Sequence, residues 1–238
     1  MPIAPQTLPA RDLEALFDAL PDVVFFIKDR DGRYTHANLT LVARLGLRNR
    51  NEVVGRHVTE LFPAELGRGY AAQDRRVLEG ELIESQLEVH IFPSRKPGWC
   101  LTCKRPLRAQ QEISGLVGIS RDLSPPDGRH PTYDRLRHAF AYLQQHYAAP
   151  VRMQTLADLA SLSVAQLERH FRRVFLLTPH QALNKLRIEA AMQLLRGKES
   201  VAAIGVACGF ADQSAFARRF KATVGMTPRA YRGLLATL

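Results

Sequence analysis

The chain has 238 residues, enough for two domains of ordinary size, each with its own core. It carries 33 Lys and Arg residues against 23 Asp and Glu residues. Residues 1–128 are balanced at 17 against 17, so the whole surplus of +10 lies in residues 129–238, which hold 16 basic and 6 acidic residues.

This composition excludes several classes of protein. No segment approaches the roughly 18 consecutive apolar residues that a membrane helix needs, and residues 1–21 lack the apolar run of a signal peptide. Three cysteines are too few and too scattered for a disulfide framework. We therefore predict a cytoplasmic protein without a membrane partner, and the basic half favours a polyanionic partner such as nucleic acid.

The first half alternates short apolar runs with turns, which predicts an α+β domain over residues 10–124. The expected strands are 23–28, 34–38, 82–92, 99–107 and 116–121, with a hairpin turn at 29–32. Short helices are expected over 39–47, 60–66 and 70–79. This order gives an antiparallel sheet with helices on one face.

Residues 125–134 are the predicted linker, because their prolines and glycine cannot continue a helix or a strand. The hydrophobic period then becomes helical, with a helix expected over 133–147. No strand candidate follows, so the second domain, residues 135–236, is predicted to be all-α.

The first domain resembles a PAS domain in four segments: 20–32, Asn38, 54–56 and 118–123. The resemblance implies a sensor that responds to a small-molecule effector, or a surface that forms a homodimer. The cofactor stays unknown. A reactive cysteine in a helical Asn-Cys-Arg motif, expected for flavin, is absent, and the helix over 70–79 has no histidine for haem.

Apolar side chains of this domain are candidates to line an interior ligand site, with ordinary core packing as the alternative for each. These candidates are Phe25, Ile27, Leu41, Trp99 and Leu101. No metal site is predicted, since His36, His57 and His90 are interpreted as hydrogen-bonded polar residues. Cys100 and Cys103, three apart on an expected strand, would point to opposite faces and would not share a metal or a disulfide.

The basic half repeats a pattern. Residues 167–175 before Thr178-Pro179 match residues 216–224 before Thr227-Pro228. A short apolar helix, 156–160 or 201–208, and a tight turn precede each copy. This arrangement is typical of two helix-turn-helix units.

Helical spacing predicts one buried and one exposed face for the longer helix of each unit. The buried stripes are Leu167, Phe171 and Val174 in the first unit, and Phe216, Phe220 and Val224 in the second. The exposed candidates for DNA contact are Gln166, Arg169 and Arg173, then Ser214, Arg218 and Lys221, with Gln213 beside them. Arg and Gln can make two hydrogen bonds to a base edge. A single amphipathic helix would be interpreted as an ordinary solvated face, but two such basic helices favour DNA.

This half resembles the AraC/XylS family of bacterial regulators over about residues 135–236. The carriers are Leu156-Ala157, Ser163, Leu167, Arg169-His170-Phe171, Pro179, Leu186-Arg187, Ala191, Ile204-Gly205, Gly209-Phe210, Asp212-Gln213-Ser214, Phe216, Arg218, Phe220-Lys221, Gly225, Thr227-Pro228 and Tyr231-Arg232. Two positions depart from the family: Gly205 replaces a small alanine, and Leu176-Leu177 replaces a glycine-containing turn.

The resemblance implies a seven-helix domain in which a long helix, about 179–195, sets the spacing between the two units. It also implies base-facing residues, namely Val164, Ala165, Gln166 and Arg169, then Gln213, Ser214, Ala215 and Arg218. Periodicity and resemblance select Arg169 and Arg218 independently.

The sequence therefore predicts a transcriptional regulator that binds double-stranded promoter DNA in a sequence-specific manner, with RNA polymerase as a further candidate partner. Activation is the expectation we carry forward, although the residues alone leave repression open. The alternative is a ligand-binding protein whose basic helical half docks on an acidic protein. No Ser/His/Asp, metal-ligand or phosphate-loop pattern supports an enzyme.

Overall fold

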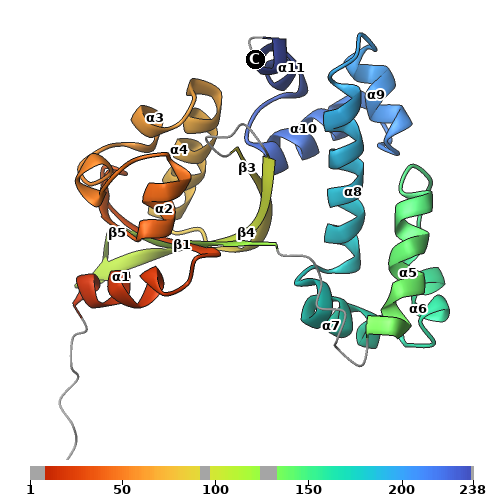
Figure 1. Ribbon diagram of the computed structural model, residues 1–238, viewed down its shortest axis with the longest axis horizontal. Coiled ribbons are helices and arrows are strands. Elements are labelled where there is room, and N and C mark those ends of the chain that lie inside the picture. The colour runs from red at the N-terminus through yellow and green to blue at the C-terminus, as the bar shows by residue number, and fades with distance from the viewer. Residues whose placement is uncertain (1–8, 92–96, 124–132, 237–238) are drawn as a thin grey trace, which may run out of the picture. The chain divides into compact units, whose positions relative to one another are not determined.

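The computed structural model describes residues 9–91, 97–123 and 133–236, and the chain forms two compact units, Met1–Asp122 and Leu123–Leu238 (Figure 1). Each unit is described by itself. The predicted linker lies outside the described residues except for its last two, which open a helix. Among the described helices, none has the length and apolar character that crossing a bilayer requires.

The N-terminal unit is built on a five-stranded antiparallel sheet in the order β2-β1-β5-β4-β3. The strands are β1 (Val23–Asp29), β2 (Tyr34–Ala37), β3 (Ile83–Ile91), β4 (Pro97–Ala109) and β5 (Glu112–Asp122). All five predicted strands are present, although β4 and β5 are longer than expected. The turn at 29–32 joins β1 and β2 as predicted, because the Asp29 carboxylate accepts from the backbone N–H of Asp31 and Arg33.

Helices cover both faces of this sheet unequally (Figure 1). One face carries α2 (Leu39–Arg44), the short η1 (Arg50–Glu52), α3 (Val58–Leu61) and α4 (Ala64–Leu78). The other carries α1 (Ala10–Asp18), which the sequence did not predict. The predicted helices 60–66 and 70–79 were divided wrongly, because the chain is extended at Phe62 and Pro63, which separate α3 from α4.

Asn38 joins three of these elements and is fully buried. Its side-chain oxygen accepts from the N–H of Leu41, capping α2, and from the N–H of Phe25 in β1. Its amide group donates to the carbonyls of Val23 and Phe17. One amide therefore fixes the start of α2 against β1 and the end of α1.

The register of the sheet places four of the five ligand candidates on one face of the sheet. Phe25 stacks on Phe17 of α1, with 4.5 Å between ring centroids, so it lies on the face away from α2–α4. Phe25 and Ile27 pair with Ile119 and Val117 of β5, and paired residues share a face. The same register places Trp99 and Leu101 on that face. Leu41, on α2, lies on the opposite side of the sheet.

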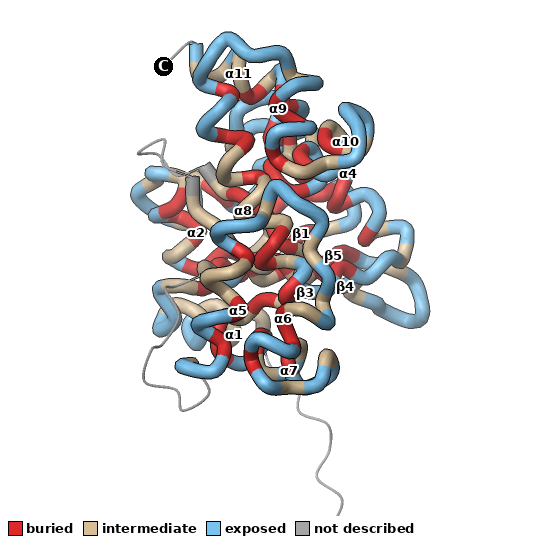
Figure 2. The backbone as a smooth tube through the Cα atoms, turned by 90° about the vertical axis from the view of Figure 1, so that its right-hand side faces the viewer, coloured by how far each residue is buried: buried red, intermediate tan, exposed pale blue. Residues whose placement is uncertain are grey.

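The described part of the C-terminal unit contains seven helices and no strand, as the sequence predicts. They are α5 (Tyr133–His146), α6 (Met153–Leu159), α7 (Val164–Phe175), α8 (Pro179–Leu194), α9 (Val201–Ala207), α10 (Gln213–Val224) and α11 (Pro228–Ala236). In this unit α6 packs on α7 and α9 packs on α10, while α8 contacts α5, α7 and α9. Figure 2 shows buried and exposed stretches alternating along these helices, as amphipathic helices around a core require.

The two helix-turn-helix units follow the same local rules. Ser163 caps α7 and Asp212 caps α10, each accepting from a backbone N–H three residues on. Each longer helix has 12 residues and ends at a left-handed residue, Leu176 with φ 59° and Gly225 with φ 83°. A constant offset of 49 residues relates Val164 to Gln213 and Leu176 to Gly225.

A packing compensation explains one departure from the family pattern. A methyl group on Gly205 of α9 would lie only 3.0 Å from the Cβ of Phe216 in α10. The short helices correspond with an offset of 48 residues, from Met153–Leu159 to Val201–Ala207, which pairs Gly205 with Ala157. In the longer helices Leu167 corresponds to Phe216. The second helix-turn-helix unit thus combines the smaller residue, Gly205, with the larger side chain, Phe216.

Candidate functional sites

The exposed face of α7 carries a basic stripe. The predicted stripe Leu167, Phe171 and Val174 is buried, which fixes the rotation of the helix against its unit. Ala165, Arg169, Arg172 and Arg173 are all exposed on the other side, at the i, i+4, i+7 and i+8 spacing of one helical face. Val164 is half-buried at the start of the helix.

Helix α10 repeats this arrangement. Phe216, Phe220 and Val224 are fully buried, as predicted. Ser214, Arg218 and Lys221 are exposed at i, i+4 and i+7, Gln213 is exposed at the first turn, and Ala215 is half-buried.

The structure adds one residue to the predicted surface. The 49-residue offset pairs Arg169 with Arg218 and Arg172 with Lys221. The sequence pattern selected Lys221 in the second unit but Arg173, rather than the equivalent Arg172, in the first. Applying the offset to both units would have found Arg172.

The arginines and the lysine of these two stripes have no ion-pair partner within the described part of the chain. Elsewhere in the unit Lys185 pairs with Glu189 at 2.6 Å. The stripes therefore present uncompensated positive charge, which attracts phosphate groups.

The side chain of Gln166 is exposed and also caps the start of α7. Its side-chain oxygen accepts from the N–H of Ser163 at 2.9 Å, while Ser163 Oγ accepts from the N–H of Gln166 at 3.2 Å. This capping box uses the amide oxygen and leaves the amide NH₂ group to meet a ligand. A bidentate contact to adenine uses both ends of the amide, so Gln166 makes one only by sharing its oxygen with the Ser163 N–H or by opening the box.

The two helix-turn-helix units lie at opposite ends of α8 (Figure 1). This helix has 16 residues, about 24 Å at 1.5 Å per residue. Thr178 and Gln181 form a capping box at its start, with Pro179 in the first turn. The long helix thus separates the two basic stripes rigidly, as the sequence predicts.

The space between the sheet and α2–α4 in the N-terminal unit is strongly polar. Asp74 of α4 contacts Lys28 Nζ at 2.5 Å and Lys104 Nζ at 2.7 Å, and all three side chains are buried. Lys28 Nζ also lies 4.1 Å from the centre of the Tyr34 ring. This cluster occupies the region where an apolar interior was expected.

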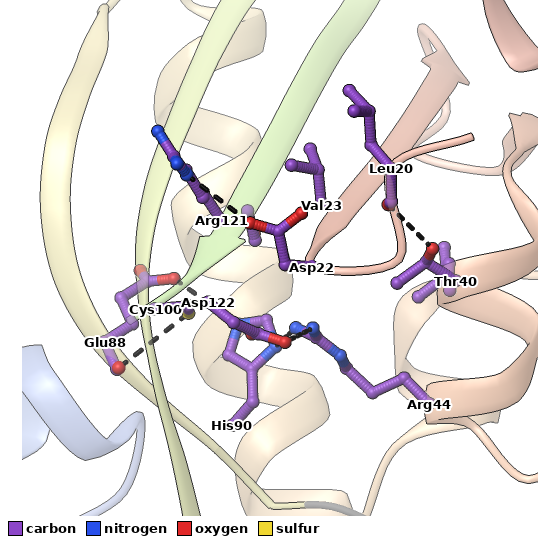
Figure 3. A network of polar contacts seen from close by, with 12 residues as sticks. Leu20, Asp22, Val23, Thr40, Arg44, Glu88, His90, Cys100, Arg121 and Asp122 are labelled. Carbon is purple, nitrogen blue, oxygen red and sulfur yellow. Dashed lines mark hydrogen bonds and ion pairs between the residues drawn. The ribbon is translucent and has the colours of Figure 1, made fainter. Parts of the chain in front are cut away.

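A second polar cluster lies in the same interior, around Glu88 of β3 (Figure 3). Thr102 donates to the Glu88 carboxylate at 2.6 Å, and Gln73 of α4 donates to it as well. Arg44 of α2 contacts His90 Nδ1 at 3.1 Å and pairs with Asp122 at 2.6 Å. These contacts link α2, α4 and three strands.

Ionisation in this interior follows from burial and pairing. Burial alone would raise the pKa of Asp74, but Lys104 and Lys28 outweigh it and hold that pKa below its ordinary value. Burial lowers the pKa of Lys28 despite its pairing with Asp74. Burial opposes protonation of His90, but Cys100 and Glu88 prevail and raise its pKa to about 9.

Comparison with known families agrees with this architecture. Residues 17–126 match the PAS fold family and residues 156–233 match a helix-turn-helix domain family. The transcriptional activator RhaS of Escherichia fergusonii is 38% identical over 118 residues, which are 49% of this chain and 42% of that protein. RhaS of an Enterobacter species is 36% identical over 157 residues, 66% of this chain and 51% of that protein. The chain thus spans about half the length of these curated relatives.

Among solved structures, an AraC-type transcriptional regulator from Chromobacterium violaceum is 29% identical, with a TM-score of 0.41 over 43% of this chain and 93% of that one. The folds and family matches define a two-domain protein in which a PAS-fold domain precedes a helix-turn-helix domain. This order of a PAS-fold domain and a helix-turn-helix domain agrees with the predicted resemblance to AraC-type regulators with an N-terminal PAS domain.

Proposed function

We propose that this protein regulates transcription by placing α7 and α10 in successive major grooves of promoter DNA. The observation that carries the proposal is the pair of exposed, unpaired basic stripes, each on a helix anchored by a buried apolar stripe in a helix-turn-helix domain. A major groove about 12 Å wide admits one helix. Two helices at opposite ends of α8 then meet grooves roughly 34 Å apart along one face of the duplex.

Roles within each stripe follow from side-chain chemistry. Arg169 and Arg218 can each make two hydrogen bonds to a guanine edge, and Gln213 can do so with adenine. Arg172, Arg173 and Lys221 lie farther along their helices and are assigned to phosphates, which set the register of the protein on the duplex. Val164, Ala165, Ser214 and Ala215 supply the small contacts near the helix starts.

The N-terminal unit is proposed to form a homodimer and to respond to a small-molecule effector. Exposed apolar side chains support the dimer, since Leu16 on α1 is 64% exposed and Leu20, which follows α1, is 44% exposed. Activation through RNA polymerase in the cytoplasm is proposed because the relatives are named transcriptional activators. The proposal contains no catalytic step.

The test is selection of bound sequences from a random double-stranded DNA library by the full chain, followed by affinity measurements on the selected site. Arg169→Ala and Arg218→Ala should each weaken specific binding by about 1–3 kcal/mol and relax the preference at one position. Arg229→Ala is the matched control, because Arg229 is an exposed arginine on α11, outside both stripes.

Failure to enrich any sequence would overturn the proposal. Equal losses in the control and in both stripe variants would assign the effect to net charge alone. Salt-sensitive binding without sequence preference would favour the alternative, in which the basic half meets an acidic protein.

A further inference from the structure

Three potential metal ligands converge in the interior of the N-terminal unit: Glu88 and His90 of β3, and Cys100 of β4. One oxygen, one ring nitrogen and the sulfur of these residues all lie within 4.8 Å of one another. Glu88 and Cys100 are cross-strand partners in the sheet, and His90 is two residues from Glu88, so all three point to the same face. Figure 3 shows them together beneath the helices.

The ring of His90 turns one nitrogen toward the other donors of this cluster. His90 Nε2 lies 3.8 Å from Glu88 Oε2, while its other nitrogen faces Arg44. The Cys100 side chain is fully buried and the Glu88 side chain is 6% exposed. Donor atoms on one tetrahedral zinc ion lie about 3.5 Å apart, so a closure of about 1 Å would complete the geometry.

Two buried acceptors beside this cluster have no hydrogen-bond partner within the described residues. They are Gln73 Oε1 and Asp122 Oδ1. Gln73 is 6% exposed and donates to Glu88 through its other amide atom, so its unpaired oxygen lies at the edge of the cluster. Buried acceptors without partners are costly, and a nearby cation removes that cost.

From this geometry we propose that Glu88, His90 and Cys100 bind one Zn²⁺ ion inside the N-terminal unit. A thiolate, an imidazole and a carboxylate together favour a borderline-soft divalent metal over Mg²⁺ or Ca²⁺. Binding forms a Zn–S bond and a Zn–N bond to His90 Nε2, and it releases to solvent the thiol proton of Cys100 and the proton that His90 carries on Nε2 while it is paired with Glu88. The fourth position is left for water or the Gln73 oxygen. The imidazole then carries its remaining hydrogen on Nδ1, so Arg44, whose Nη1 lies 3.1 Å from Nδ1, must move away from that nitrogen.

This site is independent of DNA reading, so its test needs no DNA. The metal-free full chain is titrated with Co²⁺ as a spectroscopic probe, and Zn²⁺ is then added to displace it. We expect one Co²⁺ per chain and a thiolate-to-cobalt charge-transfer band that disappears on Zn²⁺ addition. His90→Gln should weaken binding at least tenfold, and Cys100→Ser should remove the band.

Cys103→Ser provides the matched control, because Cys103 lies three residues along the same strand, where Ser85 N–H donates to its sulfur at 3.2 Å. It should bind Co²⁺ like the wild type. X-ray absorption of the zinc-loaded wild type gives a readout that needs no variant, and one sulfur in the coordination shell is expected. Absence of stoichiometric binding, a shell without sulfur, or an unchanged band in Cys100→Ser would each overturn the proposal.

Discussion

Leu176 and Gly225 occupy equivalent positions after α7 and α10, and both adopt the left-handed backbone conformation. Glycine does so without steric cost, whereas for an L-residue this conformation costs roughly 1–2 kcal/mol because its Cβ approaches the following carbonyl oxygen. The first unit therefore carries backbone strain at a point where the second does not.

Leu176→Gly should stabilise the C-terminal unit by about 1 kcal/mol, since the relief of strain exceeds the added flexibility of the unfolded chain. Urea unfolding of the full chain, followed by far-ultraviolet circular dichroism, measures this. The reciprocal change, Gly225→Ala, should destabilise the unit by a similar amount. A lower unfolding midpoint for Leu176→Gly would show that its half-buried side chain contributes more than its backbone costs.

A substitution at Asp74 should also have a large effect on stability, because its carboxylate pairs with the buried ammonium groups of Lys28 and Lys104. Asp74→Asn leaves both lysines without a carboxylate and should cost about 3–5 kcal/mol of the unfolding free energy of the N-terminal unit. Trp99, the single tryptophan of the chain, reports on this unit by its fluorescence.

The contribution of Asp74 to the stability of the N-terminal unit should decrease as the pH falls. The pKa of Asp74 is lowered in the folded unit, so its contribution is present above the pKa of the unfolded chain and is lost as the pH falls through the folded value. Acid unfolding of the wild type should therefore be steeper than that of Asp74→Asn. Parallel acid transitions for the two proteins would contradict this assignment.

At the scale of single elements, one side chain at the start of α7 combines a folding role with the proposed contact to DNA. Gln166 closes the capping box with Ser163 and also stands at the exposed end of the basic stripe. Weaker DNA binding by Gln166→Ala would therefore be ambiguous.

Gln166→Glu separates the two roles. Glutamate closes the same capping box and favours a helix N-terminus, so the unfolding free energy should stay within about 0.5 kcal/mol of the wild type. The new carboxylate would face the phosphates and lacks an amide donor, so specific DNA affinity should fall at least tenfold. Filter binding and urea unfolding on the same preparation check both halves, and unchanged DNA affinity would exclude Gln166 from the interface.

The helical elements were predictable where periodicity and capping agree. Buried stripes and Ser163 or Asp212 locate α7 and α10 to within a residue, and repetition identifies their shared role. In the N-terminal unit β1 is apolar on both faces, because α1 covers one side and α2–α4 the other. Its alternation is lost, so the sequence could not assign Phe25 or Ile27 to a face.

The polar interior of the N-terminal unit could not be predicted from the sequence, for a different reason. Lys28, Asp74 and Lys104 lie far apart in the sequence, and each by itself is typical of a surface residue. The register of the sheet and the packing of α4 against it bring them together. The same applies to Glu88, His90 and Cys100, which carry no metal-binding spacing along the chain.

At the scale of the whole molecule, the surplus of positive charge belongs to one half of the chain. Removing one phosphate-binding side chain should reduce the slope of log affinity against log salt by about 0.9. Arg172→Gln should show this reduction on any duplex, because phosphates carry no sequence information. Titrations at several salt concentrations measure the slope, Arg229→Gln serves as the control, and an unaltered slope in Arg172→Gln would remove it from the interface.

The 49-residue correspondence between α7 and α10 is a repeat of shape but not of surface. The first helix presents alanine, glutamine and two arginines where the second presents serine, alanine, arginine and lysine. If the chain were rotated by 180° on its DNA site, α7 and α10 would exchange places, although their exposed residues differ. The proposed binding therefore has one preferred orientation along the promoter. Inverting the DNA site should therefore reverse the orientation of the bound chain. Transcription from a fixed start site should then change.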